Sequence, residues 1–279
     1  MKPASFRYER PGSLAAALRL LTENEAARPI AGGQSLGPML NLRAATPELL
    51  IDIARLTELK RIESDGEAII IGAGVRHADV EDGGVPDVLD GLLARVARGI
   101  AYRAVRNRGT IGGSLAHADP AADWPSVMIA LGATIHVRSA KGARTIAAAD
   151  LVIGALTTSL APDELIEAIR IPRYDRAARA GFHKICLKPG DFAEALAVVV
   201  ADPARKEVRA VLSGNGQPPI LMPATARVVS AASGQDSSAI KRAVQEDFRT
   251  SGLDSELSAY EASLHQASMV RAAREVWKS

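Results

Sequence analysis

The chain of 279 residues is long enough for about two domains and a sizeable buried core. Lys and Arg number 34 and Asp and Glu 32, so the formal net charge is +2, and 47% of the residues are hydrophobic; this is an ordinary globular composition without the basic excess of a nucleic-acid-binding protein. The single cysteine, Cys186, excludes an internal disulfide, a multi-cysteine zinc site and a cysteine-ligated iron–sulfur cluster on this chain.

The first elements form a small α/β unit. Residues 13–22 carry apolar side chains at helical spacing behind the potential N-cap Ser13, which predicts a helix. Short apolar runs predict strands at residues 29–31 and 47–53. The unit is expected to end near Leu56.

The next stretch of the chain is predicted to be mainly sheet. A helical segment at residues 88–99 ends at a glycine C-cap signal. A turn at Lys141-Gly142 joins two segments of alternating or apolar character, which predicts an antiparallel pair. The strands expected in this stretch are 67–72, 133–139, 143–147 and 165–171.

An Arg- and Ala-rich segment, residues 173–180, is the best candidate for a domain boundary. Apolar runs beyond it predict a smaller domain of sheet and helices. The chain is therefore predicted to be an α+β protein, in which two N-terminal subdomains precede this domain. Its strands are expected at 181–187, 192–200 and 207–212, and its helices at 239–248 and 257–277.

Two Gly-Gly turns, each following apolar residues and each closed by a serine, are the strongest candidates for a binding site. Adjacent glycines can adopt positive φ and let consecutive backbone N–H groups converge on an anion, and a pyrophosphate suits two such turns. The alternative is that they are only tight turns; neither is a P-loop, because no Gly-Lys-Ser/Thr follows. The first turn comprises Ala31, Gly32, Gly33, Gln34 and Ser35, and the second Thr110, Ile111, Gly112, Gly113 and Ser114.

A third glycine segment, residues 72–77, follows a predicted strand and invites comparison with a dinucleotide-binding fingerprint. It is one glycine short, because His77 stands where the fingerprint needs a small residue. We therefore do not predict a Rossmann-type NAD site.

Other residues leave alternatives open. His117 could contact a cofactor or, more in keeping with a loop histidine, bond a neighbouring carboxylate. Cys186 could act in redox chemistry, but a buried small apolar residue is the favoured interpretation. Arg103, Arg106 and Arg108 could attract an anionic cofactor, meet a partner chain, or form a solvated face.

Targeting signals are not apparent. Residues 1–12 lack the apolar stretch of a secretory signal, and the longest apolar candidate, residues 195–201, is far shorter than the roughly 18–20 residues of a membrane span. Together with the lone cysteine, this favours a cytoplasmic protein without a membrane span.

Two segments carry a family resemblance: AGGQSLGPMLNLR at residues 31–43 and VRNRGTIGGSLAHADPAADWP at 105–125. They resemble the paired FAD-binding signatures of the flavoprotein (medium) subunit of molybdenum hydroxylases, a family that includes the carbon monoxide dehydrogenase medium subunit and the FAD domain of xanthine dehydrogenase. The resemblance extends over nearly the whole chain. It implies a two-subdomain, PCMH-type FAD-binding domain at residues 1–175, with subdomains of about 1–56 and 57–175, and a carbon monoxide dehydrogenase flavoprotein C-terminal-like domain at 176–279.

The resemblance also implies where FAD would bind. The two glycine segments would hold the pyrophosphate and ribityl chain, and Asp123 would be a polar ligand on the flavin side. Lys184 and Phe192 fall where the family places a lysine and an aromatic residue near the flavin ring. No catalytic residue and no metal ligand is expected on this chain.

The implied function is electron transfer. In such enzymes a large molybdopterin subunit oxidises the substrate, a small subunit carries electrons through two [2Fe–2S] clusters, and FAD passes them to an acceptor such as NAD, oxygen or a quinone. The chain is thus expected to be the FAD-dependent medium subunit of a cytoplasmic heterotrimer. The alternatives are a free-standing FAD-dependent oxidoreductase and a non-enzymatic scaffold whose glycine segments are turns only.

Overall fold

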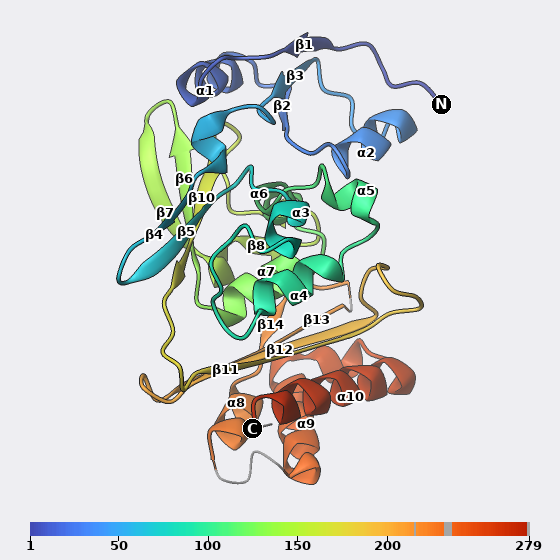
Figure 1. Ribbon diagram of the computed structural model, residues 1–279. Coiled ribbons are helices and arrows are strands. Elements are labelled where there is room, and N and C mark those ends of the chain that lie inside the picture. Colours follow the sequence, from blue (N-terminus) through green and yellow to red (C-terminus); the bar gives the residue numbers. More distant parts are fainter. Residues whose placement is uncertain (215, 232–235, 278–279) are drawn as a thin grey trace.

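The computed structural model describes residues 1–214, 216–231 and 236–277. Three sheets of three to five strands follow one another along the chain, and Figure 1 shows them stacked in that order from the N-terminal to the C-terminal end of the molecule. Helices lie between and beside the sheets. The α+β fold class is confirmed by this architecture and by the solved structures it resembles.

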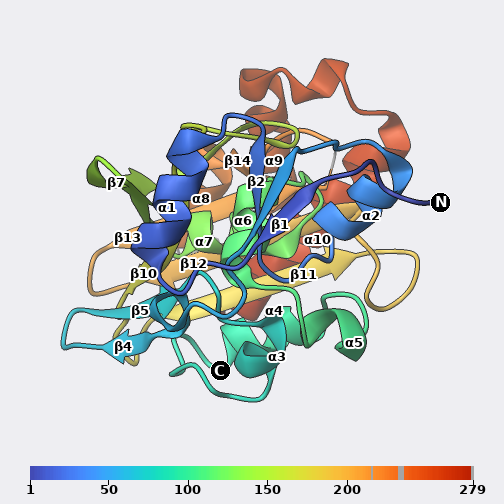
Figure 2. The same ribbon diagram turned by 90° about the horizontal axis from the view of Figure 1, so that it is seen from above.

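The N-terminal sheet is small and parallel, with strand order β1-β3-β2. Helix α1 begins where predicted, because the Ser13 hydroxyl accepts the Ala16 N–H at 3.2 Å. Its apolar side packs on strand β3, and α1 and α2 flank the sheet on opposite sides (Figure 2). The elements are β1 (Arg7–Glu9), α1 (Leu14–Glu23), β2 (Ala27–Ile30), α2 (Leu36–Leu42), β3 (Leu49–Asp52) and a 3₁₀ turn (Thr57–Lys60).

The middle sheet has five strands in the order β4-β5-β10-β6-β7, all antiparallel. The predicted hairpin is confirmed as β6 paired with β7. Five helices pack beside this sheet (Figure 1), of which sequence patterns predicted only α4. The strands are β4 (Ile62–Ser64), β5 (Ala68–Gly72), β6 (Thr134–Ser139), β7 (Gly142–Ala147) and β10 (Leu165–Pro172), with a separate pair β8 (Val152–Gly154) and β9 (Thr157–Thr158); the helices are α3 (His77–Glu81), α4 (Leu92–Arg98), α5 (Arg103–Arg106), α6 (Ile111–His117) and α7 (Asp123–Ala130).

The C-terminal sheet is antiparallel, with strand order β11-β12-β13-β14, and α10 packs along β11 and β12 (Figure 1). Both predicted helices are present, while α8, which begins at a proline, was not predicted. The elements are β11 (Arg179–Ile185), β12 (Ala195–Asp202), β13 (Glu207–Ser213), β14 (Ile220–Leu221), α8 (Pro223–Ser230), α9 (Ser237–Ser251) and α10 (Ala259–Glu275).

Strand β12 is buried on both faces. Leu196, Val198 and Val200 belong to the core of the middle sheet and its helices. Ala197 and Val199, which point the other way, belong to the core formed with the C-terminal helices. The middle and C-terminal sheets are therefore held together by one shared strand layer.

None of the helices in the described residues combines the length and the apolar character that crossing a membrane requires.

Candidate cofactor site

The first glycine turn, residues 31–35, joins β2 to α2 and leaves its backbone donors available. Gly33 has a φ of +71°, in the left-handed region that favours glycine. Within the described part of the chain, no hydrogen-bond acceptor meets the N–H groups of residues 32–35. Four consecutive available donors at one turn are suited to bind an anion.

Gly32 is needed for a different reason, which is close approach. A Cβ atom at Gly32 would lie 2.1 Å from the carbonyl oxygen of Arg108 and 2.7 Å from the Cα of Gly109. The Arg108 Nε also donates to the carbonyl of Gly32 at 3.4 Å. The first glycine turn thus touches the chain immediately before the second glycine segment.

The second glycine segment was expected to be a turn, and this is wrong: it is the start of helix α6. The Thr110 hydroxyl caps the helix by accepting the Gly113 N–H at 3.1 Å. The N–H groups of Ile111 and Gly112 donate to carbonyls of the connection between β5 and α3. These two N–H groups are used inside the protein and are not available to a phosphate, whereas FAD binding by the segment 110–114 stays a prediction.

Gly112 allows α6 to begin against that connection. A Cβ atom at Gly112 would lie 2.4 Å from the Cβ of Ala73. The third glycine segment, residues 72–77, therefore serves as the surface on which α6 starts.

His77 belongs to this packing. Its Nδ1 accepts the indole N–H of Trp124 at 3.1 Å, and its side chain is buried. Burial, and then the charge of Arg106, lower the pKa of His77 to about 4. His77 is therefore neutral at physiological pH and holds Trp124, the residue that follows Asp123.

Asp123 and Lys184, predicted separately, form a buried ion pair. Asp123 begins α7 and Lys184 lies on β11; the Nζ of Lys184 is 3.1 Å from Asp123 Oδ2, and the two side chains are 8% (Lys184) and 5% (Asp123) exposed. Lys184 also donates to the carbonyl of Gly99. Asp123 Oδ1 is buried and has no hydrogen-bond partner in the described structure, so it is an acceptor available to a ligand.

Burial raises the pKa of Asp123 to about 6, against the opposing effect of Lys184. Because the folded-state pKa lies above the ordinary value of 3.8, the folded protein binds the proton more tightly than the unfolded chain. This carboxyl should therefore lose about 3 kcal/mol of stabilisation as pH rises from about 4 to 6. Urea titrations give the free energy of unfolding of wild type minus that of Asp123→Asn, and we expect this difference to decrease as pH rises across this range. A difference that does not change with pH would contradict the assignment.

Phe192 lies in the connection between β11 and β12, with its side chain 63% exposed. The connection is fixed at two points: the Ala101 N–H donates to the Gly190 carbonyl, and the Ala193 N–H donates to the carbonyl of Ala121. The exposed aromatic ring is thus held close to the segment that leads into Asp123.

The remaining candidates are resolved in part. Arg106 is not on a solvated face: it is buried and pairs with Glu81 at 2.7 Å. Arg103 pairs with the same carboxylate and is partly exposed.

Cys186 is half-buried, so the prediction of a buried residue is wrong. The ring of His117 makes no hydrogen bond in the described structure, contrary to the favoured interpretation.

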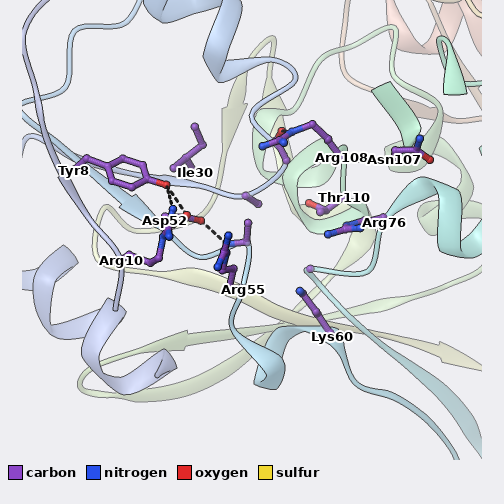
Figure 3. Close-up of a pocket in the computed structure, with 14 residues that line it drawn as sticks. Tyr8, Arg10, Ile30, Asp52, Arg55, Lys60, Arg76, Asn107, Arg108 and Thr110 are labelled. Carbon is purple, nitrogen blue, oxygen red and sulfur yellow. Dashed lines mark hydrogen bonds and ion pairs between the residues drawn. The ribbon is translucent and has the colours of Figure 1, made fainter. Parts of the chain in front are cut away.

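A cavity of about 470 Å³, which sequence reasoning missed, lies between the N-terminal sheet and the helices of the middle sheet (Figure 3). Only Ala31, Gly32 and Thr110 of the predicted site residues line it. Its remaining lining is mostly polar or charged and comes from segments scattered between residues 8 and 108. No sequence motif predicts the cavity, because its charged residues are spread over 98 positions, from Arg10 to Arg108.

Comparison with known proteins gives a consistent result. Residues 4–174 match the model of the family described as the FAD binding domain in molybdopterin dehydrogenase. The chain is 39% identical over 217 residues to the nicotine 6-hydroxylase medium subunit of Paenarthrobacter nicotinovorans, covering 77% of this chain and 76% of that one. It is 41% identical over 202 residues to the carbon monoxide dehydrogenase medium chain of Afipia carboxidovorans, covering 72% and 70%.

The fold is similar to those of solved structures over almost its whole length. A chain of the carbon monoxide dehydrogenase from Hydrogenophaga pseudoflava, in a form lacking the Mo-pyranopterin moiety, superposes with a TM-score of 0.89 at 30% identity, covering 99% of both chains. A chain of quinoline 2-oxidoreductase from Pseudomonas putida 86 gives a TM-score of 0.88 at 30% identity, covering 99% of this chain and 98% of that one.

Proposed function

Because the chain belongs to the family of FAD-binding domains of molybdopterin dehydrogenases and is an FAD-binding oxidoreductase subunit of the molybdenum hydroxylase kind, we propose that it is the electron-transferring medium subunit of a heterotrimer. Its proposed partners are a small [2Fe–2S] subunit and a large molybdopterin subunit. The lone cysteine supports this division of labour, since this chain cannot ligate a cluster by itself.

The described residues fit FAD. The available N–H groups of residues 32–35 would bind the pyrophosphate, and the Ser114 hydroxyl at the exposed side of α6 would add a donor. The observation that carries the proposal is the unpartnered Oδ1 of buried Asp123, beside Lys184 and the segment that holds Phe192. When bound, the flavin supplies the redox chemistry, accepting electrons from one side and releasing them to an acceptor.

The protein's own residues would bind and orient. Lys184 keeps Asp123 ionised near neutral pH, so that Oδ1 can accept a hydrogen bond from the N–H of a flavin ring. Phe192 would cover a ring face. These residues come from both sides of the proposed boundary between an FAD-binding domain at 1–175 and a C-terminal domain at 176–279, so the ring would lie where the two domains meet.

The proposal is tested with the chain purified together with its native partners. FAD, identified after denaturation, should be present at one per chain. In rapid-mixing experiments the flavin absorbance should bleach when the reduced [2Fe–2S] partner chain is added, and should return with an external acceptor. Flavin that is reduced directly by organic substrates, with this chain alone, would favour a free-standing oxidoreductase; a complex without flavin would contradict both.

Replacing Phe192 with alanine should weaken FAD binding about 10-fold without changing the stability of the flavin-free protein. The side chain is mostly exposed, so its removal leaves no cavity, whereas a stacked flavin would lose an aromatic contact. The matched control is Leu187→Ala in the same connection, where the side chain is 85% exposed. FAD titrations followed by flavin fluorescence check the result; equal affinities of the two variants would contradict the role of Phe192.

A further inference from the structure

The cavity beneath the N-terminal sheet is lined by four cations that no carboxylate neutralises in the described structure: Arg55, Lys60, Arg76 and Arg108. They come from four separate places, namely the segment after β3, the end of the 3₁₀ turn, the residue before α3 and the segment before α6. Figure 3 shows their charged ends directed toward the same space. Convergence from four segments distinguishes this cluster from a run of surface charge along one helix.

The carboxylate of the cavity is already engaged. Asp52 accepts the Tyr8 hydroxyl at 2.5 Å, the Arg10 Nε at 3.2 Å and the backbone N–H of Ala54 at 2.9 Å. These bonds lower its pKa despite burial, so Asp52 stays ionised and is matched by Arg10. The other four cations therefore leave the cavity with a strong positive potential.

The cavity lies next to the predicted cofactor site but is separate from it. Gly32 and Thr110 border both, and the contact of Gly32 with the Arg108 carbonyl forms the wall between them. Asp123, Lys184 and Phe192, by contrast, take no part in its lining. The cavity adjoins the pyrophosphate end of the predicted site and lies away from the flavin end.

We propose that this cavity binds a phosphate-bearing ligand, with Arg55, Lys60, Arg76 and Arg108 holding the phosphate oxygens. A di- or polyphosphate matches several converging cations better than a single carboxylate does, because arginine and lysine pair with each of its oxygens. The volume of about 470 Å³ suits a ligand of nucleotide size.

The ligand is a phosphorylated molecule separate from FAD, because the proposed function, on which this point rests, assigns the FAD diphosphate to the N–H groups of residues 32–35. FAD and this ligand should therefore bind at the same time.

The test uses inorganic pyrophosphate as the probe, in calorimetric titrations at fixed ionic strength. Wild-type chain is compared with Lys60→Gln/Arg76→Gln, in which both side chains are exposed, so that folding should be unaffected. The variant should bind pyrophosphate at least about 10-fold more weakly, because two charge-assisted contacts are lost. The matched control, Lys241→Gln/Arg242→Gln on α9, removes the same charge from a distant exposed helix and should bind as wild type does.

Each titration is made on flavin-free and FAD-loaded protein, with FAD content measured separately. Binding of pyrophosphate to both forms supports the proposal. Binding to flavin-free protein alone, abolished by FAD, would overturn it, because the cavity would then hold part of FAD. Equal affinities for wild type and the Lys60/Arg76 variant would overturn the proposal whether or not FAD is bound. An absence of pyrophosphate binding to the wild-type chain would overturn the proposal as well. If the Lys60→Gln/Arg76→Gln variant alone then also loses its partner subunits on co-purification, the cations belong to a protein interface.

Discussion

Replacing Gly32 with valine should weaken FAD binding at least about 100-fold while the C-terminal sheet stays folded. A Cβ atom at this position would lie 2.1 Å from a backbone carbonyl, which no side-chain movement can relieve. The first glycine turn must therefore move away from residues 108–110, and the N–H donors of residues 32–35 move with it. Loss of two hydrogen bonds to a charged pyrophosphate accounts for the expected change.

The matched control is Gly37→Val in α2, five residues further on, where a Cβ atom would meet nothing within 4 Å. Both variants are compared by flavin absorbance per chain and by FAD titration of flavin-free protein, with circular dichroism to verify folding. A folded Gly32→Val protein that retains full FAD content would show that the first glycine turn is not part of the cradle.

Replacing Lys184 with methionine should destabilise the protein by about 3–5 kcal/mol at pH 7, because it leaves the Asp123 carboxylate buried without its cation. The pKa of Asp123 should rise further, since Lys184 is the group that opposes the effect of burial. The double variant Asp123→Asn/Lys184→Met should recover most of this stability, because it buries no charge.

Urea unfolding of flavin-free protein measures this effect apart from cofactor contacts. Lys188→Met, at an exposed position that forms no ion pair in the described structure, is the control and should change stability by less than about 0.5 kcal/mol. If Lys184→Met is no less stable than this control, the pair contributes little to the fold. FAD titrations of the double variant then report the combined loss of the Asp123 charge and of Lys184.

Elements with strong local signals were predictable. Helix α1 has both an N-cap and regular apolar spacing, and the hairpin of β6 and β7 has alternation and a turn. The pair of Asp123 and Lys184 was predicted only as two family positions, since residues 61 apart in the chain carry no local sign that they will meet. Their proximity follows from the packing of α7 against the C-terminal sheet.

Elements without a polar face were missed. Every residue of α7 is buried, so its sequence lacks the alternation of apolar and polar sides that marks a surface helix. The glycines of α6 indicated a turn because their role is to let a helix start against a neighbouring backbone, which is a property of the tertiary structure. For Arg106 the sequence left three alternatives open, because the carboxylate with which it pairs, Glu81, is 25 residues away in the chain.

The cavity cations could not have been predicted from spacing, since Arg55 and Arg108 are 53 positions apart and only the fold directs them into one space.

The shared layer of β12 and β13 means that the domain boundary proposed near residue 175 would not separate two independent hydrophobic cores. Alternate residues of the same strand complete two different cores, so a fragment beginning at residue 176 would expose Leu196, Val198 and Val200 to water. Neither half can loosen without loosening the other. The position of Lys184 and Phe192 relative to Asp123 is thereby set by packed side chains and not by a hinge, so a molecule bound among them would meet the same surroundings in every copy of the protein.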